Sequence, residues 1–172
     1  RLVREVRSNR SLTYSINSTV GRSLIYPAPF AISHTGHRAD RSAEMLEVLL
    51  NEVANLSQKG ITVDEQARSA DAVVADLRAD YGQRSATMSH YADLLLQGMD
   101  VQDFASGGLR FLSLSHDAVA SRSSALIRPS ELVIVLVGDK SKILEKPKSG
   151  PGVLELCFSR GLTVRDIDSP FK

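Results

Sequence analysis

The sequence predicts an α+β fold with two neighbouring, antiparallel strands, a run of helices and one later strand. Three observations predict it. Two extended segments lie close together near the N-terminus, a series of helical apolar faces follows them, and one wholly apolar run comes after the helices. We expect this unit to be incomplete at its N-terminus, because residues 1–10 have the apolar spacing of a helix end.

The two extended segments are expected to form neighbouring strands. Residues 12–20 alternate between a largely apolar set and a set of Thr, Ser and Asn, which is typical of a half-buried strand. A turn is expected around Gly21 and Arg22. The second strand is expected from Phe30 to Thr35, since the prolines before it cannot donate to a ladder. The short connection favours antiparallel pairing.

The middle of the chain is predicted to be helical. Leucine and valine at helical intervals predict a helix from Arg41 to Lys59, and Gly60 is a suitable stop. Thr62 and Glu65 form a capping box that starts a second helix. Further helices are expected over residues 85–97, 100–104 and 115–128.

The apolar run LVIVLV, residues 132–137, predicts a central strand covered on at least one face. After Lys146 the hydrophobic pattern decays, and the candidate element is a strand over residues 153–158. We therefore divide the chain into a domain of residues 1–146 and a divergent tail of residues 147–172.

Composition excludes several classes of protein. The 172 residues suffice for one ordinary domain, and 42% hydrophobic with 24% charged residues is typical of a globular chain. The net charge of +1 argues against a nucleic-acid partner. One cysteine, Cys157, excludes an internal disulfide framework, and we expect it to be unreactive. No apolar run approaches the roughly 20 residues of a membrane span.

Few residues are candidates for chemistry. The sequence contains no nucleophile elbow and no phosphate-binding loop. His34 and His37 are expected to be ordinary surface or turn residues, because positions three apart on a strand face opposite ways. The four N-terminal arginines could bind a carboxylate, a phosphate or a peptide carbonyl, or simply form a solvated helix face. They are Arg1, Arg4, Arg7 and Arg10.

The phrase RLVREVRSNRSLTYSINSTVG resembles one in the C-terminal domain of the pitrilysin-type (inverzincin) zinc metallopeptidases, a family that includes insulysin, the mitochondrial processing peptidases and bacterial two-subunit peptidases. The segments GITVDE, SLSHDAVAS and LIRPSELVIVLVGD resemble later motifs of the family, in the same order. The resemblance covers about residues 1–146. It implies a metallopeptidase-like α/β unit, incomplete at its N-terminus, in which an antiparallel-rich sheet is covered on one side by a run of helices. Three positions of the first phrase differ, since Ser8, Asn9 and Ser11 stand where the family commonly has Glu, Lys and Gly.

The resemblance implies the substrate-binding, non-zinc half of a zinc-dependent metalloendopeptidase. Arg7 and Tyr14 match the family's pair that positions the scissile carbonyl and stabilises the transition state. The H-x-x-E-H zinc motif is missing, so we expect no catalytic residue and no metal ligand in this chain, and zinc in a partner domain or subunit. An oligomer acting on peptide substrates is implied, and a soluble place in the bacterial cytoplasm or periplasm is favoured. We also expect a fragment, since the chain begins without Met.

Two alternatives remain open. The same fold serves as a non-catalytic core or scaffold subunit in larger complexes. A peptide- or anion-binding α+β module that uses the arginine cluster is the third interpretation.

Overall fold

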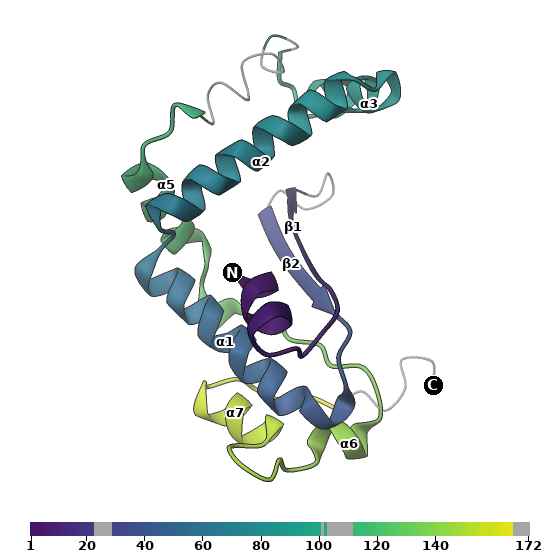
Figure 1. Ribbon diagram of the computed structural model, residues 1–172, viewed down its shortest axis with the longest axis vertical. Coiled ribbons are helices and arrows are strands. Elements are labelled where there is room, and N and C mark those ends of the chain that lie inside the picture. The colour runs from purple at the N-terminus through teal and green to yellow at the C-terminus, as the bar shows by residue number, and fades with distance from the viewer. Residues whose placement is uncertain (23–28, 101, 103–111, 167–172) are drawn as a thin grey trace. The chain divides into compact units, whose positions relative to one another are not determined.

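The computed structural model describes residues 1–22, 29–100, 102 and 112–166 (Figure 1). The chain forms two compact units: Arg1–Ser57 with Ile127–Lys172, and Gln58–Leu126. The architecture is α+β, as predicted, with helices predominating and a two-stranded antiparallel sheet in the described residues.

The sheet belongs to the first unit. Strands β1 (Ile16–Arg22) and β2 (Pro29–Thr35) pair from Ile16 opposite Thr35 to Arg22 opposite Pro29. The turn expected around Gly21 and Arg22 is wrong, because the ladder continues through both residues. Gly21 allows it, since a Cβ there would lie 2.9 Å from the ring of Phe30 on the opposite strand.

The strand expected over residues 132–137 does not form in the described structure. This stretch follows the 3-10 turn η3 (Pro129–Glu131) and runs without a sheet partner to helix α6 (Lys140–Leu144). Leu132 and Leu136 pack against the core of the first unit. Val133, Val135 and Val137 are exposed, so the alternation of the apolar pattern is present in the exposure of the side chains although the predicted strand is not.

Helix α1 (Ser42–Lys59) carries both apolar clusters of the first unit, and the 3-10 turn η2 (Ala39–Arg41) leads into it. In one cluster, its Met45 and Val48 pack with Val6 and Leu12. The other cluster joins α1 to α6 and to helix α7 (Val153–Ser159), and its buried members are Ala43, Leu46, Leu50, Ile143, Val153, Leu156 and Cys157.

Residues after Lys146 therefore contribute to the core of the first unit. The strand expected over residues 153–158 is wrong, because this segment is helical. Val153, Leu156 and Cys157 are spaced at i, i+3 and i+4, which places them on one helical face. The backbone N–H of Gly152 donates to the Glu155 carboxylate at 3.1 Å and so caps the helix N-terminus.

The second unit is helical in its described residues, with α2 (Val63–Tyr81), α3 (Arg84–Leu96) and α5 (His116–Leu126). The capping box predicted at Thr62 and Glu65 is confirmed, with its two bonds at 3.2 and 2.9 Å. The helix expected over residues 100–104 falls largely outside the described residues. The Nε2–H group of His116 donates to the Ile61 carbonyl oxygen at 2.9 Å and so joins the start of α5 to the segment before α2.

The burial of α7 predicts low thiol reactivity. Cys157 is 9% exposed, and burial raises the pKa of its thiol, so little thiolate is present at neutral pH. We expect an aromatic disulfide reagent to label Cys157 on the order of 100-fold more slowly in native buffer than in urea. L156A removes a core side chain and should speed native labelling, whereas L154A, at a more exposed position, should not. Equal rates in native buffer and urea would contradict this packing.

Candidate functional site

Tyr14 lies in the turn between the N-terminal helix and β1, and its side chain is 95% exposed. Its neighbour Thr13 is only 9% exposed. The Thr13 hydroxyl donates to the Gly36 carbonyl at 2.6 Å and accepts from the Ser15 backbone N–H at 3.2 Å. The Thr35 hydroxyl lies 2.9 Å from the Thr13 oxygen. The buried threonine thus anchors the turn while the phenol of Tyr14 projects into solvent.

Arg7 lies on a short π-helix, η1 (Val3–Asn9), in which Val6 is fully buried. The Arg7 side chain is exposed, and no carboxylate of the described residues forms an ion pair with it. π-Helical turns are uncommon and occur often at functional sites. The guanidinium is thus available to a carbonyl, carboxylate or phosphate.

The backbone between the two residues reverses at Ser11, whose φ is +50°. This left-handed conformation is uncommon for residues other than glycine. The turn is closed by the Leu12 N–H, which donates to the Val6 carbonyl at 2.7 Å, and by the Ser11 N–H, which donates to the Arg7 carbonyl at 3.1 Å. Arg7 and Tyr14 are therefore joined through a hydrogen-bonded turn whose apolar residues, Val6 and Leu12, pack on α1.

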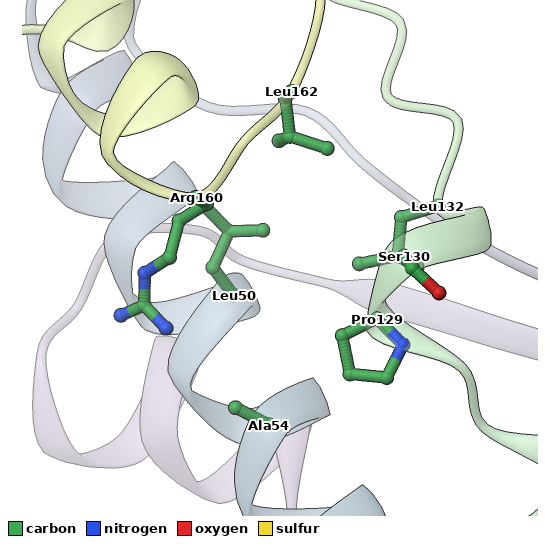
Figure 2. A pocket seen from close by; sticks show the side chains of 7 residues that line it. All are labelled: Leu50, Ala54, Pro129, Ser130, Leu132, Arg160 and Leu162. Carbon is green, nitrogen blue, oxygen red and sulfur yellow. The ribbon is translucent and has the colours of Figure 1, made fainter.

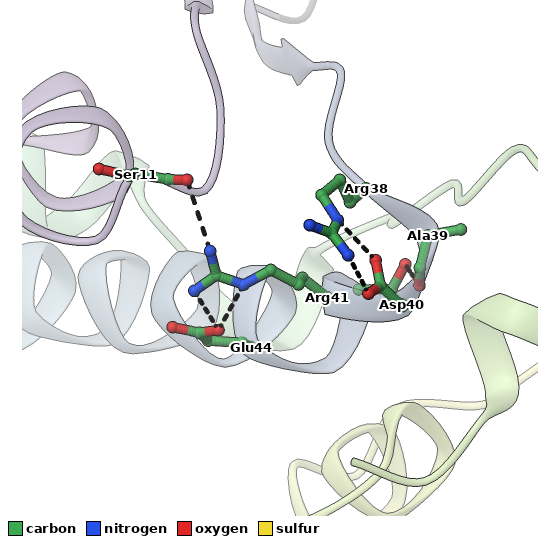
Figure 3. Close-up of polar contacts among 7 residues, drawn as sticks. Ser11, Arg38, Ala39, Asp40, Arg41 and Glu44 are labelled. Atoms are coloured by element: carbon green, nitrogen blue, oxygen red, sulfur yellow. Dashed lines mark hydrogen bonds and ion pairs between the residues drawn. The ribbon is translucent and has the colours of Figure 1, made fainter. Parts of the chain in front are cut away.

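Arg41 connects this turn to the start of α1 (Figure 3). Its guanidinium binds the Glu44 carboxylate at 2.6 and 3.0 Å and donates to the Ser11 carbonyl at 3.4 Å. Both charged side chains are about one-third exposed, so solvent screens the pair and limits its contribution to stability. Arg41 instead helps to hold the turn in place, because its charged guanidinium donates to the carbonyl of Ser11, the residue with the left-handed backbone. Arg38 and Asp40 form a separate exposed ion pair beside it.

No hydrogen bond or ion pair joins Arg4, Arg7 and Arg10 to one another within the described residues. The Arg4 guanidinium lies 3.5 Å from the Glu5 carboxylate, whereas Arg7 and Arg10 form no ion pair among the described residues. No hydrogen bond joins Arg7 to Tyr14 in this part of the chain. Together they offer two exposed donors, a guanidinium and a phenol, on either side of an anchored turn. Such donors suit an extended peptide carbonyl or a developing oxyanion.

The histidines do not add a reactive site. His34 is exposed on β2, and the half-buried His37 lies 2.9 Å from the Ser42 hydroxyl. Ser42 is 1% exposed and donates its proton to the Ala39 carbonyl at 2.8 Å. The His37 Nε2 atom therefore carries the donor hydrogen, and the buried serine is inaccessible to a substrate.

Sequence reasoning missed a small pocket in the first unit (Figure 2). It measures about 180 Å³, and its walls come from α1, η3 and the residues after α7: Leu50, Ala54, Pro129, Ser130, Leu132, Arg160 and Leu162. The Arg160 guanidinium donates to the Asn51 side chain at 2.5 Å. Neither Arg7 nor Tyr14 lines this pocket. Its walls come from segments far apart in the sequence, so no local motif indicates it.

Among the described residues, no three His, Cys, Asp or Glu side chains lie together in a way that could hold a metal ion. No helix in the same ranges is both long and apolar enough to cross a membrane.

Compared with protein-family models, with curated proteins and with solved structures, the chain matches none of them.

The left-handed backbone at Ser11 predicts that S11G stabilises the protein. Glycine adopts a positive φ without a Cβ penalty, although it loses more backbone entropy on folding. We expect the free energy of unfolding to rise by up to about 1 kcal/mol, measured by urea denaturation. S8G, within η1, serves as the control and should lower stability, since glycine weakens a helix interior. Destabilisation by S11G would contradict the conformation at this turn.

The buried contact of His37 predicts a loss of stability in mild acid. Burial lowers the pKa of His37 from 6.5, so the unfolded chain binds the proton more readily than the folded chain. The contribution is intact above the unfolded pKa and falls as the pH decreases through it. Urea titrations between about pH 5 and pH 8 should show this slope. H37Q should remove part of it, whereas H34Q, at an exposed position, should retain it.

Proposed function

We propose that this chain is the substrate-binding, non-zinc half of a zinc-dependent metalloendopeptidase. The observation that carries the proposal is the anchored turn that presents Arg7 and Tyr14. A tyrosine side chain that is 95% exposed stabilises no core, and a guanidinium without an ion-pair partner among the described residues is free to bind a peptide. These are the two residues that match the family's positioning pair.

The conformation of Ser11 supports the same proposal. The family commonly has glycine at this place in the phrase, and here the position has φ +50°, where glycine is the favoured residue. A serine there retains the turn at some conformational cost. The place at which the family commonly has glycine is therefore a place at which the backbone of this chain favours glycine.

The proposed roles follow from the chemistry of the side chains. Arg7 would bind and orient the carbonyl of an extended peptide through its fixed N–H donors. Tyr14 would donate its phenolic hydrogen to the oxygen on which negative charge develops. No three side chains that could hold a metal ion lie together among the residues that the structure describes. In this proposal the zinc, which would polarise the carbonyl and activate water, belongs to a partner carrying H-x-x-E-H. In the complete unit, helices would cover one face of the sheet.

The alternative is a non-catalytic core or scaffold subunit with the same fold. The observation that favours it is the apolar stretch 132–137, in which Val133, Val135 and Val137 are 74–90% exposed. Exposed apolar side chains in a row are typical of an assembly surface. A scaffold would not require the exposed donors of Arg7 and Tyr14.

Variants in the assembled enzyme test the proposal. The complex is purified from the source cells with its zinc-bearing partner and assayed for cleavage of an unstructured peptide. We expect R7A and Y14F each to lower kcat about 100-fold or more, because removal of one transition-state donor has an effect of this order. KM should change less. R10A, an exposed arginine of the same segment, is the control.

Normal kcat in both R7A and Y14F would refute the site. A metal-free assembly that contains this chain and cleaves no peptide would favour the scaffold. Since Tyr14 makes no core contact, a change in thermal stability of Y14F is not expected, and circular dichroism of each variant separates loss of function from loss of fold.

A further inference from the structure

Two threonine hydroxyls close the end of the β1–β2 hairpin at which the chain enters β1 and leaves β2. The last pair of the ladder is Ile16 opposite Thr35, so Ser15 and Gly36 are the first residues beyond it. The Thr13 hydroxyl donates to the Gly36 carbonyl at 2.6 Å, and the Thr35 hydroxyl donates to the Ser15 carbonyl at 2.8 Å. We call these two crossed hydrogen bonds the threonine clasp.

The clasp assigns one acceptor to each hydroxyl, because a hydroxyl carries one hydrogen. For Thr13 the Gly36 carbonyl is the nearer acceptor, since the Ser15 carbonyl lies 2.9 Å away. For Thr35 the Ser15 carbonyl, at 2.8 Å, is nearer than the Gly36 carbonyl, at 3.4 Å. Without the Thr35 hydroxyl, the single hydrogen of Thr13 cannot satisfy both carbonyls.

Tyr14 lies between the two residues that the clasp holds. Thr13 is 9% exposed, and its hydroxyl also accepts from the Ser15 backbone N–H at 3.2 Å. The Ser15 carbonyl accepts from Thr35. The backbone is therefore tied on both sides of Tyr14, whereas the Tyr14 side chain is 95% exposed.

Thr35 contributes to this turn from the other strand, 20 residues after Ser15 in the sequence. The ladder from Ile16 to Arg22 is made by backbone groups, so replacement of the Thr35 hydroxyl by a methyl group leaves the ladder in place. Valine is also a favourable strand residue of similar shape. What such a replacement removes is the donor to the Ser15 carbonyl.

We infer that Thr35 is a positioning residue for Tyr14, which it holds through the threonine clasp. The kinetic consequence rests on the proposed function, in which Tyr14 donates to the oxygen that gains negative charge. Misplacement of such a group by about 1 Å can lower the rate on the order of 100-fold. The effect on the turn itself does not depend on the proposed function and can be measured in this chain alone.

Nitrogen-15 relaxation of the full chain tests the effect on the turn. We expect order parameters near 0.85 for the backbone N–H groups of Tyr14 and Ser15 in the wild type, and below about 0.6 in T35V. T35S retains the hydroxyl and should retain the order. The control is S33A, because the Ser33 hydroxyl lies 2.8 Å from that of Ser18 across the same hairpin but is not part of the clasp. Wild-type order parameters in T35V would overturn the inference.

Kinetics of the assembled enzyme with an unstructured peptide test the consequence for Tyr14. We expect T35V to lower kcat about 10-fold, with a smaller change in KM, and T35S and S33A to leave kcat close to wild type. In the Y14F background, T35V should cause no further loss, because the donor that Thr35 positions is already absent. An equal loss from T35V in the wild-type and Y14F backgrounds would overturn the inference.

The two proposals fail in different ways. A loss of kcat in Y14F with normal kcat in T35V would overturn the role of Thr35 and leave the proposed function standing. Normal kcat in Y14F would overturn the proposed function, and the order parameters of T35V would then decide the role of the clasp. Circular dichroism establishes that each variant is folded.

Discussion

Helix α1 buries apolar side chains on two faces, and each face gathers a different part of the chain. Met45 and Val48 hold Val6 and Leu12 of the N-terminal segment, while Leu46 and Leu50 hold α6 and α7. Removing buried side chains of this size costs about 2–5 kcal/mol each, which is a large fraction of the stability of a domain. The N-terminal turn and the C-terminal helix thus depend on one central element.

The proposed site illustrates how buried residues fix exposed ones. Arg7 follows the buried Val6, and Tyr14 follows the nearly buried Thr13. The hydroxyl of Thr13 binds the Gly36 carbonyl, so the turn is tied to the end of β2 as well as to α1. The Arg7 and Tyr14 side chains are exposed and form no hydrogen bond or ion pair among the described residues, so their position depends on these neighbours. A rigid support of this kind suits residues that must orient a substrate.

The first unit also leaves many apolar side chains exposed. The β1–β2 hairpin leaves Val20 and Ile32 more than half exposed, and the valines of residues 132–137 are exposed further. A two-stranded sheet has few positions at which such side chains can be buried. An assembly with a partner domain or subunit, as proposed above, would offer a way to cover surface of this kind.

The sequence by itself determined the local structure where the signal is local. The capping box at Thr62, the stop at Gly60 and the long apolar face of α1 could be predicted, because each depends on neighbours within a turn or two. The alternation of polar and apolar residues and the short connection predicted the two antiparallel strands. It did not determine that Gly21 continues the ladder, that residues 153–159 are helical and buried, or that residues 132–137 have no strand beside them. Tertiary structure decided these, since each depends on a partner far along the chain: Phe30 across the hairpin, the face of α1 for α7, and for LVIVLV a partner that the described residues do not supply. The exposed donors Arg7 and Tyr14 could be proposed from the sequence, whereas their support by Thr13, Ser11 and Arg41 became visible only in three dimensions.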